Sequence, residues 1–205
     1  MARGCSGFDL KKRESAVDSC LGANGAIYAI RRTAWPGIPD NTFIDDFVIA
    51  MRVRESGLRV IYDTEAVATE ELPESVAQEM TRRIRIGAGD FQSLTLCWRS
   101  LLPWRGLYVW SFWSHKVLRW VTPFLMVTAL ISNAFIAGAH PVLAATMVLQ
   151  LAFYALAVLG AIVRGRKITL FSAPHYFVTI NLALLLGFFR FVTGTQQAAW
   201  KRTAR

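Results

Sequence analysis

Three long runs without a charged residue occupy the second half of the chain, and they restrict its fold more than any other feature. They are residues 120–139, 141–163 and 168–189. A helix crosses the roughly 30 Å hydrocarbon core of a bilayer with about 20 apolar residues. The first two runs therefore predict transmembrane helices joined by a tight turn over Gly138–Pro141. The third contains polar side chains and a proline, so it either spans the bilayer or is broken or partly re-entrant.

The charges are divided unevenly along the sequence. All 14 acidic residues lie in residues 1–90 together with 12 basic residues, whereas residues 91–205 contain 11 basic residues and no acidic one. This division predicts a water-facing first part and a membrane-bound second part. It argues against a nucleic-acid-binding domain, because the basic half is also the apolar half. The cysteines show no metal-binding spacing and fit reduced thiols; they are Cys5, Cys20 and Cys97.

Residues 91–118 combine tryptophan and tyrosine with arginine and lysine. Such side chains favour the headgroup level of a bilayer, so we expect an interfacial amphipathic segment here; the alternative is the edge of a soluble core. The basic loop Arg164–Lys167 predicts a cytoplasmic location for itself and for the first 118 residues. The basic tail 196–205 conflicts with this topology, since three full spans would put it outside while its charge favours the inside.

Residues 1–90 predict a mixed α/β domain built from short elements. In order, these are a strand over 26–30, a helix from a capping box at Thr42 and Asp45 to Gly57, a strand over 58–62, and a helix from about Pro73 to about Gly87.

Two groups of charged side chains in this domain could carry chemistry. Asp45 and Asp46 fall in the first turn of the predicted helix, where free N–H groups and the helix dipole favour ionised carboxylates and suit a general base. Arg82 and Arg85 lie about one turn apart and could grip a diphosphate. Each group alone has a simpler explanation, because acids often cap helices and paired arginines often face solvent or lipid headgroups.

In their order along the chain, these motifs resemble the C-terminal half of membrane-integrated family 2 glycosyltransferases, the group of cellulose, chitin, hyaluronan and bacterial exopolysaccharide synthases. The resemblance runs from about residue 12 to the end of the chain. It rests on four segments, which are 22–32 (GANGAIYAIRR), 44–46 (IDD), 57–62 (GLRVIY) and 82–86 (RRIRI).

The resemblance implies a GT-A type catalytic domain that transfers a sugar, with inversion, from a nucleotide sugar to a glycan or lipid acceptor in polysaccharide biosynthesis. Asp46 matches the proposed general base of the family, and Asp45 takes the place of the acid before it. Residues in the segment that approaches the acceptor are Asn24, Gly25 and Tyr28.

The sequence also departs from the pattern of this family. Arg85 matches the arginine of the Q-x-x-R-W motif, whereas Arg82 replaces its glutamine and Ile86 its tryptophan, a departure from the pattern of processive synthases. The D-x-D metal motif would precede residue 1, so Mg²⁺ or Mn²⁺ is expected in the full-length enzyme with ligands outside this chain. We therefore expect a fragment that is inactive alone. The alternative is a non-catalytic or degenerate membrane subunit that docks onto a complete synthase.

The predicted organisation has four parts, which are a partial cytoplasmic catalytic domain at 1–90, an interfacial segment at 91–118, transmembrane helices at 119–195 and a basic tail at 196–205. The expected location is the inner membrane of the cell, with several passes and the catalytic part in the cytoplasm. Expected partners are a nucleotide sugar, a glycan or lipid acceptor, the lipid bilayer and other synthase subunits, and no nucleic acid.

Overall fold

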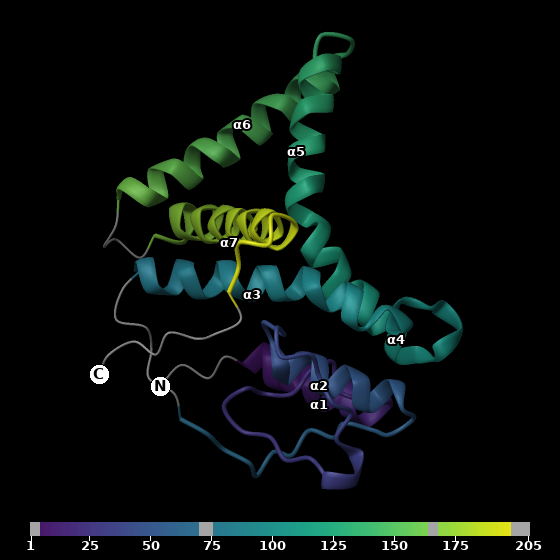
Figure 1. The fold of residues 1–205 in the computed structure, drawn as a ribbon. Helices are drawn as coiled ribbons and strands as arrows, with labels where there is room; N and C mark the ends of the chain where they lie inside the picture. Colours follow the sequence, from purple (N-terminus) through teal and green to yellow (C-terminus); the bar gives the residue numbers. More distant parts are fainter. Residues whose placement is uncertain (1–4, 70–75, 164–167, 198–205) are drawn as a thin grey trace.

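The computed structural model describes residues 5–69, 76–163 and 168–197, and most of these residues are helical (Figure 1). The elements, in chain order, are α1 (Cys5–Val17), the 3-10 helix η1 (Arg32–Ala34), α2 (Asp45–Glu55), α3 (Val76–Leu96), the 3-10 helices η2 (Trp98–Leu101) and η3 (Pro103–Arg105), α4 (Leu107–Phe112), the π-helix η4 (Trp113–Val117), α5 (Leu118–Ile136), α6 (Pro141–Ile162) and α7 (Thr169–Val192).

The predicted α/β fold class is wrong. Within the described ranges no residue belongs to a strand, and β-type pairing is confined to an isolated antiparallel bridge between Asn24 and Ile27. The Ile27 N–H donates to the Asn24 carbonyl oxygen at 3.1 Å, so this segment makes a tight turn instead of a strand. The described residues therefore contain no sheet of a GT-A domain.

The second predicted strand, 58–62, is not a strand, and its backbone bonds to Ser15 of α1 and to Ser19 and Cys20 just after that helix. The Val60 N–H donates to the Ser19 hydroxyl at 2.9 Å, and the Val60 carbonyl accepts from the Cys20 N–H at 2.9 Å. The Tyr62 N–H donates to the Ser15 hydroxyl at 3.0 Å. These bonds satisfy backbone groups that a neighbouring strand would otherwise take, so the β-like composition does not lead to a sheet.

An ion pair links the segment just after α1 to α2, and its arginine also contacts α4. The Arg54 guanidinium binds Asp18 with two bonds, Nε to Oδ1 at 3.0 Å and Nη2 to Oδ2 at 3.1 Å. The same guanidinium lies over the Tyr108 ring, 4.6 Å from its centroid. The α1–α2 layer, residues 10–62, is thus attached to the helices that follow it.

α2 begins at Asp45, two residues later than a Thr42 cap would place it, and the predicted capping box is absent. Ile44 is the N-cap residue and makes no side-chain cap bond. The Thr42 hydroxyl instead donates to the Pro39 carbonyl at 2.7 Å, within the preceding loop. Gly57 follows the end of the helix with φ of 90°, one residue beyond the C-cap Ser56.

Three aromatic rings form the contact between α2 and the membrane helices. Phe47 lies 6.1 Å from Phe112 and 5.9 Å from Trp120 between ring centroids, and Phe112 lies 5.7 Å from Trp120. Phe112 and Trp120 are completely buried. Trp120, in the first turn of α5, is therefore enclosed by protein, although the uncharged run of the sequence begins there.

The helix predicted to end at Gly87 continues to Leu96 as α3. A Cβ added to Gly87 would lie 3.2 Å from the Cα of Leu184, and one added to Gly187 would lie 2.6 Å from the Ala88 nitrogen. These glycines allow α3 and α7 to approach closely, and Figure 1 shows the two helices side by side. Gly87 thus serves helix packing and does not end the helix.

Three helical stretches are long and apolar enough to cross a membrane, as predicted. They are Leu107–Ile136, Pro141–Ile162 and Thr169–Val192. Most of their side chains face outward, which fits contact with lipid. α5 and α6 meet in the predicted turn, where the His140 ring accepts from the Val142 N–H at 3.2 Å. These features indicate a membrane protein.

The predicted interfacial segment is divided among several short elements. It comprises the end of α3 followed by η2, η3, α4 and η4. Its tryptophans are exposed, as expected at a headgroup level, and they are Trp98, Trp104, Trp110 and Trp113. Tyr108 and Phe112 are buried against the α1–α2 layer instead.

Some of the predictions fall on residues outside the described ranges. These are the helix start near Pro73, the basic loop Arg164–Lys167 and most of the tail 196–205. Nothing in the fold therefore bears on them directly.

Candidate functional site

The acidic pair lies at the start of α2, next to the aromatic contact with α4 and α5. Asp45 is exposed and Asp46 is half-buried. The Phe47 N–H donates to Asp46 Oδ1 at 2.9 Å, which satisfies one of the free donors of the first helical turn. The Ala23 N–H donates to the Asp46 backbone carbonyl at 3.3 Å and brings the preceding glycine-rich loop alongside the pair.

The loop of residues 22–28 approaches the Asp46 carboxylate through its backbone. A Cβ added to Gly25 would lie 2.9 Å from Asp46 Oδ2, so a side chain here would displace the carboxylate. Partial burial raises the pKa of the Tyr28 phenol, and the negative charges of Asp45 and Asp46 raise it further. The structure thus brings together five predicted site residues, namely Asn24, Gly25, Tyr28, Asp45 and Asp46.

Different groups around Asp46 shift the pKa of its carboxyl in opposite directions. Burial raises the pKa of its carboxyl above the ordinary value and the charge of Asp45 adds to this, whereas the Phe47 N–H, Lys11 and Lys116 act in the opposite direction. The Lys11 ammonium donates to the Ala23 carbonyl at 3.4 Å, and that of Lys116 lies 5.4 Å from the centroid of the Phe47 ring. A carboxylate with a raised pKa, held beside two cations, suits a proton acceptor near neutral pH.

The two predicted arginines lie on α3 and make different contacts. Arg82 Nη1 lies 4.0 Å from Glu79 Oε2 on the same helix. Arg85 Nη1 donates to the Phe43 carbonyl at 2.8 Å. Arg85 therefore supports the loop before α2, two residues ahead of the acidic pair, and this contact gives it a positioning role.

Gln92, which the sequence did not single out, holds the same loop. Its Oε1 accepts from the Phe43 N–H and its Nε2 donates to the Asn41 carbonyl, both at 2.9 Å. Gln92 is seven residues after Arg85 and so lies on the same face of α3. That periodicity was available in the sequence, but the predicted helix ended at Gly87, before Gln92. The position of the acidic pair thus depends on α3.

Asp90 is a second residue that sequence reasoning missed. It is 6% exposed, and burial raises its pKa to about 7, against the opposing charges of Lys116 and Arg119, while Asp46 raises it further. The Trp120 indole N–H also favours the ionised form, although its Nε1 makes no hydrogen bond of normal geometry with a described residue. The available signal was position: Asp90 is the last acidic residue of the chain, followed at once by apolar sequence.

The π-helix η4 connects the membrane helices to α1. His115 Nδ1 lies 3.1 Å from Glu14 Oε1, and Glu14 Oε2 accepts from the Leu21 N–H at 3.2 Å. The next residue, Lys116, lies over Phe47 of α2. Single π turns are frequent at functional sites, and this one directs two successive cationic or titratable side chains toward the α1–α2 layer.

The acidic pair does not amount to a metal site within the described residues. No group of three His, Cys, Asp or Glu side chains is placed there to hold an ion. Asp45 and Asp46 provide two carboxylates without a third such side chain beside them. The Mg²⁺ or Mn²⁺ expected for the full-length enzyme has its predicted ligands outside this chain and stays a prediction.

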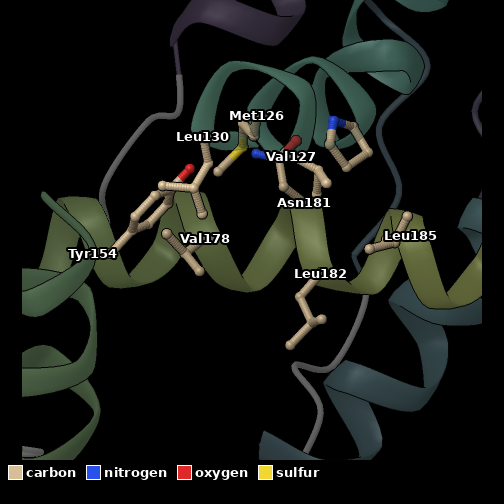
Figure 2. A pocket seen from close by; sticks show the side chains of 9 residues that line it. Met126, Val127, Leu130, Tyr154, Val178, Asn181, Leu182 and Leu185 are labelled. Atoms are coloured by element: carbon tan, nitrogen blue, oxygen red, sulfur yellow. The ribbon is translucent and has the colours of Figure 1, made fainter. Parts of the chain in front are cut away.

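A separate apolar cavity of about 250 Å³ lies between α5, α6 and α7. Its lining side chains, which Figure 2 shows, are Met126, Val127, Leu130, Tyr154, Val178, Asn181, Leu182 and Leu185, together with Pro123. The amide of Asn181 donates to the Phe177 carbonyl of its own helix at 2.9 Å. The cavity lies among the candidate membrane spans and is not part of the acidic site.

No family model, curated protein or solved structure matches the chain. The likeness to family 2 glycosyltransferases therefore rests on the sequence motifs, and the assignment of roles rests on the geometry of the named side chains.

Proposed function

We propose that this chain forms the acceptor side of a membrane-bound inverting glycosyltransferase, with Asp46 as the general base. One observation carries the proposal: the glycine-rich loop and the acidic pair, about 20 residues apart in the sequence, form a single site. Gly25 lies against the Asp46 carboxylate, and Tyr28 is close enough for the charges of Asp45 and Asp46 to raise the pKa of its phenol. A base beside an open backbone segment and an exposed phenol suits a hydroxyl-bearing acceptor.

The chemistry assigned to Asp46 is a single proton transfer. A sugar hydroxyl is a poor nucleophile until its proton is removed in the transition state. Asp46 Oδ2, the oxygen nearest Gly25, accepts that proton while the hydroxyl oxygen bonds to the anomeric carbon of the donor. The bond from this carbon to the nucleotide diphosphate breaks on the opposite face, which inverts the configuration. Lys11 and Lys116 favour the ionised carboxylate that the step requires.

The location of the site supports an acceptor that is close to the bilayer. Phe47, the residue after Asp46, contacts Trp120 at the first turn of α5. The acidic pair therefore lies where the α1–α2 layer meets the candidate membrane spans. A lipid-linked or membrane-extruded glycan would present its hydroxyl at this level.

The test is turnover in Asp46→Asn, which keeps the shape of the side chain and removes the base. We use membranes from cells that express the protein from its own gene, with a panel of radiolabelled nucleotide sugars as donors. We expect turnover to fall at least about 10²-fold. Asp45→Asn should cost less, because Asp45 is exposed and the side-chain atoms nearest to a Cβ at Gly25 belong to Asp46.

Asp40→Asn is the matched control, since Asp40 is an exposed carboxylate in the loop before α2. It should leave turnover unchanged. Near-normal turnover in Asp46→Asn would remove the base from its role. Absence of transfer by the wild-type membranes with every donor in the panel would contradict the activity itself and favour the docking subunit.

A further inference from the structure

The pairing of α3 with α7 constrains how this protein meets the membrane. The contacts, in the same order along both helices, are Arg83 with Tyr176, Gly87 with Leu184, Ala88 with Gly187 and Phe91 with Phe188. The Arg83 guanidinium lies 5.3 Å from the Tyr176 ring centroid, and the two phenylalanine centroids are 5.0 Å apart. The helices therefore run side by side in the same direction, as Figure 1 shows.

A spanning α7 would take α3 into the hydrocarbon with it. Its 24 residues measure about 36 Å, enough to cross the core. With the middle of α7 at the bilayer centre, Arg83 would lie at the depth of Tyr176, and Asp90 close to the depth of Phe188. Both positions are within the roughly 15 Å half-thickness of the core. Charged side chains at that depth are rare and costly, and α3 carries further arginines on the same turns.

We propose that α7 does not cross the bilayer but lies along one leaflet together with α3, and that, among the described helices, α5 and α6 form the membrane-spanning hairpin. The partner of the α3–α7 surface is thus the headgroup and upper acyl region of a single leaflet. Of the pair, α3 lies toward the α1–α2 layer and the headgroups, and α7 faces the acyl chains. This proposal is independent of the glycosyltransferase activity.

The outward face of α7 fits this arrangement. Its exposed side chains on the side away from α3 are apolar and include Leu182, Leu186 and Phe189. The apolar cavity of Figure 2 lies on that same side, where Val178, Leu182 and Leu185 face α5 and α6. Charge is on one side of the α3–α7 pair and hydrocarbon-compatible surface on the other, which is the pattern of an interfacial pair.

The hairpin fits the arrangement as well. Residues 120–163 contain no Asp, Glu, Lys or Arg. Figure 1 shows α5 and α6 meeting at a turn well away from α3 and α7. Two passes return the chain to its starting side, so the basic sequences at 164–167 and 198–205 would share the side of residues 1–118. This removes the conflict between the charge of the tail and a three-span topology.

The first test is the sidedness of single cysteines toward a membrane-impermeant maleimide, in intact cells and in inverted vesicles. The substitutions are Asp40→Cys before the hairpin, Ala139→Cys in its turn and Thr195→Cys after α7, all at exposed positions. The unsubstituted protein measures background labelling. We expect Asp40→Cys and Thr195→Cys to label from one side and Ala139→Cys from the other. Labelling of Thr195→Cys together with Ala139→Cys would show that α7 crosses, and labelling of all three from one side would exclude the hairpin.

The second test measures the depth of nitroxide labels in vesicles of phosphatidylcholine and phosphatidylglycerol, by collision with oxygen and with a water-soluble nickel chelate. Labels on α7 replace Ser172, Leu182 and Phe189, and those on α5 replace Leu125, Ile131 and Phe135, all exposed. Along α7 the depth should stay within about 5 Å, the radius of a helix. Along α5 it should change by about 15 Å over ten residues. A depth maximum at Leu182, with both flanking labels shallow, would overturn the proposal.

Discussion

The two helix pairs of the membrane region are held together in different ways. α3 and α7 touch backbone to backbone, since a Cβ at Gly187 would lie 2.6 Å from the Ala88 nitrogen. α5 and α6 diverge around an apolar cavity, and hydrogen bonds from the Asn133 side chain link them near their turn. Backbone contact therefore holds the first pair, and side-chain hydrogen bonds near the turn hold the second.

The largest expected effect compares the two ends of α5. Trp120, in its first turn, is fully buried against Phe47 and Phe112, whereas Phe135, in its last turn, is 85% exposed. Trp120→Ala should lower the free energy of unfolding in detergent micelles by about 3–5 kcal/mol, because it leaves a large cavity. Phe135→Ala is the matched control and should change it by less than about 0.5 kcal/mol. Equal losses would mean that α5 is held by lipid or detergent along its whole length.

The next-largest effect concerns Asp90, a buried acidic residue of α3. Asp90 has an ordinary pKa of 3.8 in the unfolded chain and a pKa of about 7 in the folded protein. The folded state therefore binds more protons between these pH values, and the free energy of unfolding falls as pH rises from about 4 to about 7. Relative to Asp90→Asn, the wild type should lose at most about 4 kcal/mol across this window and no more above it.

Denaturant unfolding of both proteins between pH 4 and pH 9 measures this difference. Lys116 and Arg119 remain in both proteins, so the difference isolates the Asp90 proton. Parallel stability curves would show that Asp90 keeps one protonation state throughout. A window displaced well above pH 7 would contradict a folded-state pKa of about 7 for Asp90.

The membrane helices could be predicted closely because their uncharged runs are long and continuous, although α5 and α7 each include one flanking arginine, Arg119 and Arg190. The runs that start after Arg119 and Lys167 begin within two residues of α5 and α7. The α/β prediction failed because Leu58–Tyr62 has the composition of a strand, while the partner that its backbone finds is Ser19 and Ser15 at the end of α1. Composition does not reveal which groups will satisfy a backbone.

The candidate site was predicted in part for a similar reason. Asp45, Asp46 and Gly25 stand out because helix starts and glycine-rich turns leave local patterns. Gln92 bonds to Phe43, and the charge of Lys116 acts on the pKa of Asp90; both partners are far away in the sequence, so no local pattern marks Gln92 or Asp90. Gly87 was misjudged because a glycine that permits close helix packing looks the same in a sequence as one that ends a helix.

The smallest effect compares the two helix pairs directly, by adding one methyl group to the α3–α7 pair and one to the α5–α6 pair. Gly187→Ala places a Cβ against the Ala88 nitrogen and the Gly87 carbonyl carbon, both backbone atoms that cannot rotate away. Overpacking of this kind costs about 1–3 kcal/mol, so we expect a loss of that size in micelles. Gly138→Ala, in the turn of the hairpin, meets no atom within 4 Å and should cost almost nothing. Because α3 also holds the loop before the acidic pair through Gln92 and Arg85, Gly187→Ala should lower any transferase turnover as well, while Gly138→Ala should not. Equal stability of the two variants would show that α3 and α7 do not pack backbone to backbone, and the contrast between the two helix pairs would then disappear.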